Sequence, residues 1–578
     1  MTFPSDAPGK LVTASSYRYW SFALAVSAGI ALLIVSPFFW RGNASGHDIA
    51  FHASSWLDAA GQWKEGILYP RWAEWANYGF GEPRFIFYPP LSWMLGAALS
   101  LLLPGNVVPG AFIVLTQTLA GLSMFGLAQR RFSLSVSIFS AACYAANPYA
   151  LLIIYMRSDF AELLACAFLP ALLLAGLSLC GLIENRWRSL GSATGIFALL
   201  LATVWLCNAP AGVLTTYSMA LLFAWGAIRE KSFRPLLLGA GGLALGFGLA
   251  CFYLIPAAYE QRWVNIVQAL ASGLQPSQNF LFTQINDPEH NLFNWIASSI
   301  AILLIVLAGF AALLGRRSLR GEDCSSERKE FWQALLLLGA ASTMLMVRPS
   351  SFLWEHLPKL RFVQFPWRWM GILAVPYAYL GAAVVARRRA AWIWAAVVTV
   401  AVAGTGVFLV QRAWWDSDDV PSLQDAIANG QGFEGTDEYD PGEDDHYNLP
   451  KNAPRFQVLP ADGTPEITPK ADVHMERWTA EDKELHVDSP KPSRLAVRLL
   501  DYPAWRVEIN GQAIKPEFAE ETAQMILPLG AGSQRISITF ARTPDRKIGA
   551  LLSGVSVLAL AGAFWGAGSG SKTGSRSL

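Results

Sequence analysis

The sequence is poor in charged residues. Lys, Arg, Asp and Glu make up 15% of the 578 residues, whereas about 25% is typical of soluble domains. Hydrophobic residues reach 53%, and the mean hydropathy is +0.33. The net charge is only +1, which favours neither nucleic acid nor a strongly acidic partner. These values exclude an ordinary soluble protein and predict a polytopic α-helical membrane protein.

Sequence signatures of soluble enzymes are missing as well. The sequence contains no GxxxxGK[ST], HExxH, CxxC or GxSxG motif, which argues against an ATP-driven pump and against the usual hydrolases. None of the six cysteines lies in a large polar segment, and no pair has metal-ligand spacing. A disulfide or zinc framework is therefore not expected.

Apolar runs that are long enough to cross a bilayer recur along most of the chain. About 20 apolar residues cross the roughly 30 Å hydrocarbon core. The first run, 20–40, is followed by no obvious small-residue cleavage site, so we expect an uncleaved anchor. Run 91–103 is short and bounded by Pro90 and Pro104, so whether it spans stays open. The sequence predicts 12–13 transmembrane segments. The further runs lie near 91–103, 108–128, 133–150, 163–183, 190–207, 213–228, 235–256, 292–314, 332–347, 367–386, 391–410 and 548–567.

Basic clusters between these runs predict the topology, because short cytoplasmic loops are enriched in Lys and Arg. Placing all of them inside sends residues 411–547 to the extracytoplasmic face. One conflict remains: an inside N-terminus and an outside loop 46–90 leave one segment too many before Arg130. The clusters are Arg130-Arg131, Arg186/Arg188, Arg229/Lys231/Arg234, Arg316/Arg317/Arg320 and Arg387-Arg388-Arg389.

The C-terminal part has a different character. Residues 416–470 are rich in Asp, Glu, Pro and Gly, which is typical of a solvated linker or irregular surface layer. Alternating apolar and polar residues then predict a small β domain, with a hairpin turn at Asn510-Gly511. The expected division is a transmembrane domain at 1–410, an extracytoplasmic linker and β domain at 411–547, and a final helix with a cytoplasmic tail at 548–578. The expected strands are 484–487, 494–500, 505–510, 524–527 and 535–540.

The polar stretch 46–91 between the first two apolar runs holds the first candidate site. Asp48 and His52 are four residues apart, which places both side chains on one face of a helix. Asp48 either caps that helix or acts as a general base or metal ligand, with His52 as its partner. Arg71 and Arg84 follow, so this stretch could bind an anionic group at the membrane surface.

A second group of charges, Arg157, Asp159 and Glu162, ends an apolar run. Charges at membrane depth are costly, so they normally pair with each other or face a cavity. One interpretation is a local salt bridge between Arg157 and the acids. The other is that Arg157 binds a phosphate while an acid completes a site with Asp48.

The third group is the aromatic segment 361–368, which has arginines at both ends. Such a run is often an interfacial belt. The sharper hypothesis places Gln364 and Arg368 on the headgroup of a lipid carrier whose chain lies along the aromatic surface. His290 and Glu289 could supply a ligand or an acid, although the sequence favours a plain surface loop.

These motifs together resemble the bacterial membrane family labelled "6-pyruvoyl-tetrahydropterin synthase-related", which is similar in layout to YfhO-like proteins and GT-C glycosyltransferases. The family pattern is D-x-x-x-H, G-x-L-Y-P-R-W, G-x-G-x-P-x-F-x-F-Y-P-P-L and R-G-x-x-A-E. Ser158 departs from it by replacing the usual Gly, and Asp159 stands where a small residue is common. The matching residues are Asp48, His52, 66–72, 79–91, 157–162 and 364–368, and segment 501–511 resembles the β domain of YfhO-like proteins.

By analogy with GT-C enzymes, whose first outer loop carries a catalytic acid, the resemblance implies a glycosyltransferase of the bacterial inner membrane. It would transfer a sugar from a polyprenyl-phosphate carrier in the bilayer to a glycan, lipid or protein acceptor, using outer loop 41–90. The alternative is a non-enzymatic scaffold or transporter in envelope polysaccharide assembly. The cofactor is undefined, with Mg²⁺ or Mn²⁺ as one option. The expected residues are Asp48 and His52 for catalysis; Arg71, Arg84, Tyr88, Arg157, Asp159, Glu162, Gln364 and Arg368 for substrate binding; and Asp48, Asp159, Glu162 and His290 for the optional metal.

Overall fold

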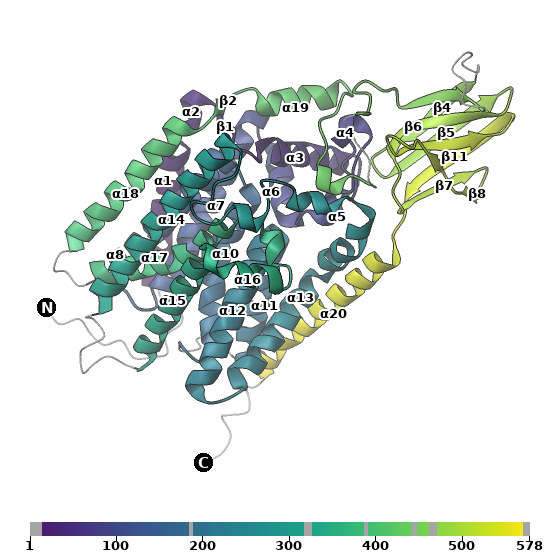
Figure 1. Cartoon of the computed structure of the whole chain (residues 1–578). Coiled ribbons are helices and arrows are strands. Elements are labelled where there is room, and N and C mark those ends of the chain that lie inside the picture. Colours follow the sequence, from purple (N-terminus) through teal and green to yellow (C-terminus); the bar gives the residue numbers. More distant parts are fainter. Residues whose placement is uncertain are drawn as a thin grey trace.

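A bundle of apolar helices forms the body of the protein, and a β domain projects from one end of it (Figure 1). The computed structural model describes residues 14–183, 189–316, 326–386, 391–441, 448–461 and 471–569. We call the end of the bundle that carries the β domain the β end. The basic clusters Arg186/Arg188, Arg317/Arg320 and Arg387-Arg388-Arg389 lie outside the described residues.

Eleven helices in the described ranges are long and apolar enough to cross a membrane. The helices α15, Ser326–Leu345, and α16, Ser351–His356, add a twelfth crossing if they are counted together as one broken span. The chain bends by 92° between them. The polytopic fold is therefore confirmed, whereas the number of spans, 11 or at most 12 in the described ranges, lies below or at the lower limit of the predicted 12–13. The spanning helices are α1 Ala14–Val35, α7 Val108–Ala128, α8 Leu134–Ala145 continued by α9 Pro148–Leu152, α10 Phe160–Leu179, α11 Leu190–Cys207, α12 Ala209–Glu230, α13 Arg234–Glu260, α14 Pro288–Gly315, α17 Met370–Val385, α18 Ala391–Arg412 and α20 Pro544–Ser569.

The short run 91–103 does not reach across a bilayer. It forms α6, Pro90–Leu102, whose 13 residues extend about 20 Å at 1.5 Å per residue. α6 packs against α3, Ile49–Lys64, at the β end. The single helix α7 then leads from this end to Arg130 and Arg131, which removes the extra segment from the predicted topology.

The two most buried spanning helices, α10 and α17, occupy the centre of the bundle. Their most apolar windows are 83% and 94% buried, whereas α18 and α20 at the periphery are only 17% and 11% buried. Both central helices begin at the β end, next to the charged residues that the sequence singled out. These charged residues are therefore held by the two most buried helices of the bundle.

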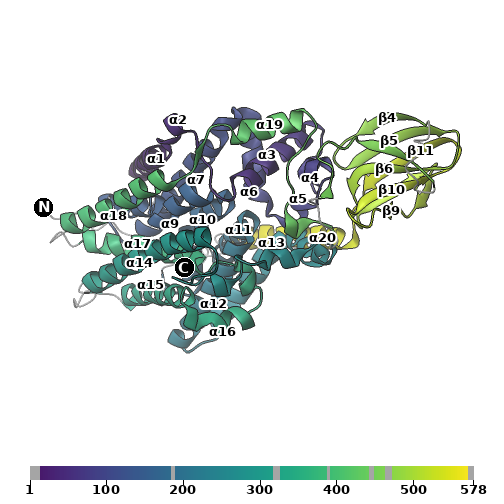
Figure 2. The same ribbon diagram turned by 45° about the horizontal axis from the view of Figure 1, so that its top comes forward.

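The first polar loop is folded between the helices and the β domain. It contains α2 Phe38–Arg41, α3, α4 Ala76–Gly79 and α5 Arg84–Phe87. Strand β1, Asn43–Ala44, pairs with β2, Trp415–Asp416, and the nearby α19, Asp419–Ala428, lies beside α3 (Figure 2). This arrangement ties the loop to the segment that follows α18.

Gly81 is needed where this loop turns. Its φ is +80°, and an added Cβ would lie 1.9 Å from Nε1 of Trp72. Trp72 is buried in the core that the loop shares with the β domain. A side chain at position 81 would therefore push the loop away from the β domain.

The β domain consists of two antiparallel sheets with the strand orders β3-β6-β10-β9 and β4-β5-β11-β7-β8. Strands of both sheets contribute to one hydrophobic core, as expected for a sandwich. Asn510 and Gly511 have φ of 52° and 77° at the β7–β8 turn, which confirms the predicted hairpin. The strands are β3 Phe456–Pro460, β4 Asp472–Trp478, β5 Asp482–Ser489, β6 Ser493–Leu500, β7 Trp505–Ile509, β8 Gln512–Ile514, β9 Glu517–Phe518, β10 Gln524–Leu529 and β11 Gly532–Phe540.

Candidate functional site

The turn between α9 and α10 positions the central charges. Arg157 ends a π-helical turn, Ile153–Arg157, and Ser158 follows in the left-handed region with φ +55°. The hydroxyl of Ser158 donates to the carbonyl of Ala44 at 2.8 Å and accepts from the amide of Gly46 at 3.0 Å. A glycine, which the family pattern has here, would adopt this φ more easily but could not make these bonds. Ser158 therefore links the turn to the first loop.

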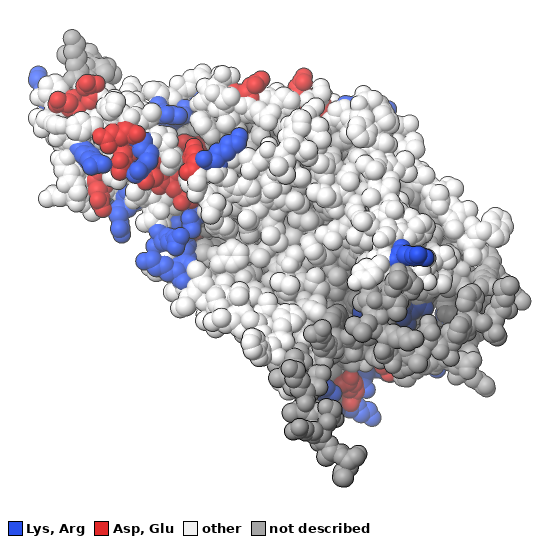
Figure 3. All heavy atoms as spheres, turned by 180° about the vertical axis from the view of Figure 1, so that it is seen from behind, with Lys and Arg blue, Asp and Glu red and all other residues white. Residues whose placement is uncertain are grey.

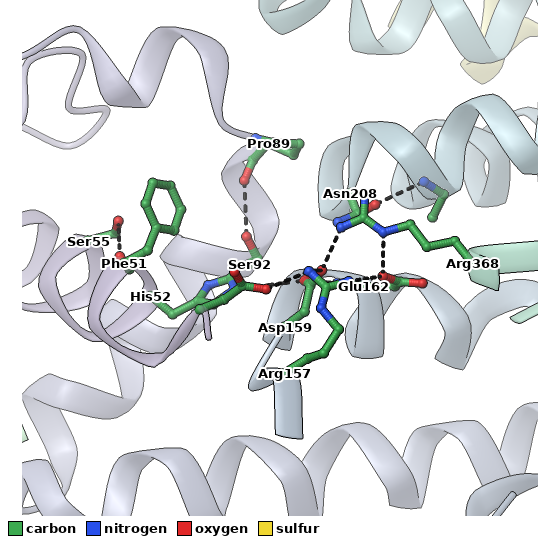
Figure 4. Close-up of polar contacts among 12 residues, drawn as sticks. Phe51, His52, Ser55, Pro89, Ser92, Arg157, Asp159, Glu162, Asn208 and Arg368 are labelled. Atoms are coloured by element: carbon green, nitrogen blue, oxygen red, sulfur yellow. Dashed lines mark hydrogen bonds and ion pairs between the residues drawn. The ribbon is translucent and has the colours of Figure 1, made fainter. Parts of the chain in front are cut away.

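Arg157 and Arg368 share two carboxylates, Asp159 and Glu162, near the N-termini of α10 and α17 (Figure 4), and Arg157 also contacts Asp48 at the start of α3. Nη2 of Arg157 lies 2.7 Å from Oδ2 of Asp48 and 3.4 Å from Oδ2 of Asp159, and Nη1 lies 3.4 Å from Oε2 of Glu162. Nη2 of Arg368 lies 3.2 Å from Asp159, and its Nε lies 3.1 Å from Glu162. The structure thus brings together residues from three distant parts of the sequence. We call these five residues the charged cluster.

The members of the charged cluster differ in their access to solvent. The side chains of Arg157, Asp159, Glu162 and Arg368 are 3–6% exposed, whereas that of Asp48 is 33% exposed. The distances from Arg157 to Asp159 and Glu162 show that the local salt bridges considered from the sequence are present. Asp48 is the carboxylate of this cluster that a bound molecule can reach most easily.

The capping interpretation of Asp48 is wrong. Asp48 occupies the N-cap position of α3 but makes no capping hydrogen bond with its side chain. Instead, its carboxylate contacts Arg157, and its backbone amide donates to the carbonyl of Arg157 at 2.8 Å. Both interactions hold the carboxylate over the turn that carries Arg157.

A cavity of about 780 Å³ lies at the β end beside the charged cluster. Its wall combines charged groups with aromatic rings, a combination suited to a ligand that has a polar head and an apolar part. The predicted residues that line it are Asp48, Tyr88, Arg157, Asp159, His290, Gln364 and Arg368; other lining residues are His47, Phe51, Phe87, Asn208, Asp287, Glu289, Phe293, Phe362, Phe365, Trp367, Thr436, Glu438 and Tyr439.

Several helix N-termini face this cavity. Asp159, Asn208 and Asp287, which line it, are the N-caps of α10, α12 and α14, and Arg368 stands just before α17. The N-terminus of a helix carries partial positive charge and favours anions. This field counteracts the excess of carboxylates over guanidinium groups in the charged cluster.

The aromatic segment 361–368 contributes to this wall and is more than an interfacial belt. The rings of Phe365 and Trp367 stack with centroids 4.9 Å apart. The guanidinium carbon of Arg157 lies 5.3 Å and 5.2 Å from the centroids of these two rings. Gln364 donates from Nε2 to the carbonyl of Ala269 at 2.8 Å. The aromatic rings therefore hold Arg157 in place from the cavity side.

Two titratable cavity residues, Glu438 and His47, were missed by the sequence interpretation. Burial, together with the charges of Glu82, Asp437 and Asp48, raises the pKa of Glu438 to about 7. Burial and the nearby Arg157 lower the pKa of His47. Glu438 belongs to an acidic stretch that reads as solvated linker, so its sequence carries no signal of burial.

Four of the predicted residues do not line the cavity: His52, Arg71, Arg84 and Glu162. His52 is buried, and its Nε2 lies 3.8 Å from Oδ1 of Asp159, behind the charged cluster. Arg84 is also buried, and its Nε lies 2.5 Å from Oε1 of Glu82. Arg71 lies 3.3 Å from Oε2 of Glu481 in the β domain. The expectation that Arg71 and Arg84 belong to the same anion site is not met by this geometry.

The optional metal site lacks a suitable geometry. Within the described ranges, no group of three or more His, Cys, Asp or Glu residues is arranged to hold a metal ion. Asp48, Asp159 and Glu162 contact guanidinium groups instead. Nε2 of His290 lies 3.3 Å from the carbonyl oxygen of Gln278.

The fold and the cavity define a polytopic membrane protein with a polar, aromatic-lined cavity at one end of its helices. The chain belongs to the family described as 6-pyruvoyl-tetrahydropterin synthase related domain, membrane protein, whose model matches residues 85–414. This match confirms the predicted family. No curated protein shows significant similarity to the chain.

Among solved structures, the chain is similar to an arabinofuranosyltransferase, AftD, from Mycobacteria, with 14% identity, a TM-score of 0.42, and coverage of 70% of this chain and 28% of that one. It is also similar to the Archaeoglobus fulgidus oligosaccharyltransferase tethered with an acceptor peptide, with 13% identity, a TM-score of 0.42, and coverage of 68% and 55%. The archaeal oligosaccharyltransferase AglB from Archaeoglobus fulgidus, in complex with an inhibitory peptide and a dolichol-phosphate, has 12% identity, a TM-score of 0.38, and coverage of 70% of this chain and 57% of that one. The chain thus spans about a quarter to a little over half of the length of these proteins.

Proposed function

We propose that this protein is a membrane glycosyltransferase of GT-C type that takes a sugar from a polyprenyl-phosphate carrier and passes it to an envelope glycan, lipid or protein. The cavity would face the outer side of the bacterial inner membrane. The observation that carries the proposal is the position of Asp48. Its partly exposed carboxylate borders a cavity of about 780 Å³ directly above the buried Arg157.

Asp48 would act as the general base. As the acceptor oxygen bonds to the anomeric carbon of the sugar, its proton moves to the Asp48 carboxylate. The bond between the anomeric carbon and the phosphate oxygen breaks, and the carrier phosphate leaves with the electron pair. The contact of 2.7 Å with Arg157 keeps the Asp48 carboxylate oriented before this transfer.

Arg157 and Arg368 would bind the carrier phosphate and stabilise the charge that develops on it. Each guanidinium carries five N–H donors. Among the described residues, each makes three contacts with carboxylate or carbonyl oxygens. The remaining donors and the helix N-termini around the cavity support phosphate binding beside the carboxylates.

The aromatic wall would accept the apolar part of the carrier and a face of the sugar. Tyr88 belongs to this wall, and its ring centroid lies 4.6 Å from that of Phe51. Burial raises the pKa of Tyr88 well above its usual value, so its phenol stays neutral and can donate a hydrogen bond. Asp159 and Glu162 would orient the arginines, and His52 would support Asp159 from behind.

The direct test is a transfer assay with the purified full-length protein. Radiolabelled polyprenyl-phosphate sugars are offered with membrane extract as the source of acceptor, and both the released carrier phosphate and the labelled product are measured. We expect label to move to an acceptor with at least one donor sugar. A panel of donors that yields no labelled product with any acceptor would contradict the proposal.

The pH dependence of carrier binding should reveal Glu438. Since the pKa of Glu438 is about 7, this residue gains a negative charge as pH rises from 6 to 8, and an anionic carrier should then bind several-fold more weakly because like charges repel across the cavity. Glu438→Gln should flatten this slope, while Glu434→Gln at an exposed neighbouring position should keep it. Titration of polyprenyl phosphate at several pH values measures the effect. Equal slopes in the wild type and Glu438→Gln would refute the assignment.

A further inference from the structure

A second cavity, of about 260 Å³, lies where α13, α20 and the first loop meet at the β end. Its wall includes four cations: Arg71 from the first loop, Arg542 just before α20, and Arg546 and Lys547 from the first turn of α20. None of its lining residues lines the large cavity. The proposed glycosyl transfer leaves this basic cavity without a role.

The four cations are engaged to different degrees. Arg546 is buried and forms a bidentate ion pair with Glu260, in which Nε and Nη2 each lie 2.7 Å from a carboxylate oxygen. Buried Asp545 lies beside Glu260, and Arg71 is paired with Glu481. Arg542 and Lys547 are exposed and form no ion pair with another described residue. Their two charges are therefore available to an anion.

The position of the cavity suits the headgroup of a membrane lipid. Basic side chains gather where the charged β domain meets the broad uncharged surface of the helices (Figure 3). Directly below, the outward face of α20 exposes apolar side chains: Ile548, Leu551 and Leu552 are 53%, 67% and 43% exposed. Basic groups at the end of a lipid-facing helix attract anionic headgroups.

Aromatic rings complete the wall on the side of the first loop. The ring of Tyr69 lies 5.9 Å from that of Phe252 on α13, and the guanidinium carbon of Arg71 lies 5.6 Å from the centroid of Tyr69. The wall of the cavity thus combines basic side chains with apolar and aromatic ones. This combination fits a phosphate group that carries an apolar chain.

We propose that this second cavity binds the phosphate of an anionic phospholipid, with Arg542 and Lys547 as the main contacts and Arg71 at the opposite wall. The acyl chains would run along the exposed face of α20. The bound lipid would connect the first loop to the last helix at the base of the β domain. The site is independent of the proposed sugar transfer.

The test measures binding of a short-chain phosphatidylglycerol to the delipidated full-length protein in detergent, by native mass spectrometry. The variant Arg542→Ala/Lys547→Ala should bind about 30-fold more weakly, because each Lys or Arg near an anionic surface contributes about a fivefold factor. The matched control Lys491→Ala/Lys515→Ala removes the same charge from exposed positions of the β domain and should bind as the wild type does.

Further arms separate the sources of phosphate. Phosphatidylglycerol that binds much more tightly than phosphatidylcholine or inorganic phosphate supports the lipid site. Inorganic phosphate that competes at equal affinity supports the same phosphate contacts with a free anion as ligand. Arg542→Lys/Lys547→Arg should restore binding, which separates lost charge from misfolding. Unchanged phosphatidylglycerol binding in the double alanine variant, or an equal loss in the control, would overturn the proposal.

Discussion

Asp48→Asn is expected to lower the rate of sugar transfer by about 10²- to 10⁴-fold, the contribution typical of a positioned general base. The asparagine has nearly the same shape and can still accept a hydrogen bond from Arg157, so the cavity keeps its geometry. It cannot take the proton of an acceptor hydroxyl. The measurement is the initial rate of transfer of labelled sugar, beside the affinity for the carrier, which should not fall because the variant removes a negative charge from the cavity wall.

Glu289→Gln is the matched control for this variant. Glu289 is another carboxylate of the cavity wall, but it stands at the start of α14 and makes no contact with the arginines of the charged cluster among the described residues. Its transfer rate should stay within a few-fold of the wild type. Normal transfer by Asp48→Asn would remove the catalytic role of Asp48, whatever the behaviour of the control.

Glu82→Ala is expected to destabilise the protein by about 3–5 kcal/mol, because it leaves the charge of Arg84 buried without its carboxylate partner. The side chains of Glu82 and Arg84 are 0% and 1% exposed, and their contact is 2.5 Å. Glu82 also accepts from the amide of Thr436 at 2.8 Å, which links the first loop to the segment carrying Glu438. Loss of this contact should also loosen the cavity wall.

Thermal unfolding in detergent, followed by tryptophan fluorescence, measures this effect. Glu517→Ala breaks the exposed pair with Arg494 on the β domain, which should contribute at most about 1 kcal/mol. Glu82→Gln keeps the acceptor for the amide of Thr436, and its unfolding temperature should lie between those of Glu82→Ala and Glu517→Ala. If Glu82→Ala unfolds at the same temperature as Glu517→Ala, Arg84 has found another partner and the assigned role of Glu82 is wrong.

The sequence singled out the members of the charged cluster because they follow recognisable patterns. Charges such as Arg157 and Glu162 at the end of an apolar run must pair or face a cavity. Segment 361–368 could be matched to them only through the family resemblance, since nothing local shows that Arg368 reaches Asp159. The convergence of three distant segments is a tertiary fact, and the structure was needed to establish it.

Arg84 shows where reasoning from charge fails. A cation in a polar loop suggests an anionic ligand, yet Glu82 stands two residues earlier and both are buried together with Ser54 and Ser55. Likewise, the acidic stretch around Glu438 suggests solvent exposure. Residues 438–440 are instead half-buried or buried, and Asn77 of the first loop donates to Asp440 at 2.8 Å. Burial of polar residues depends on partners that the local sequence does not reveal.

The β domain was predicted in outline because alternation and the Asn510-Gly511 turn are local signals. Strands β3 and β4 were missed since they lie beside or within a region whose composition suggests a linker. β4 exposes most of its side chains and so lacks clear alternation. The docking of the domain on Trp72 and Phe80 of the first loop had no sequence signal.

Carrier binding tests the central claim most directly. Polyprenyl phosphate is titrated against the purified wild type, Arg157→Ala and Arg368→Ala, with Arg361→Ala as the control, because Arg361 belongs to the same aromatic segment but lies outside the cavity. All variants are first checked for a single folded species. We predict saturable binding to the wild type and Arg361→Ala, and at least a tenfold loss in the other two. Absence of saturable binding to the wild type, or full binding by Arg157→Ala and Arg368→Ala, would contradict the account and favour a scaffold in envelope assembly.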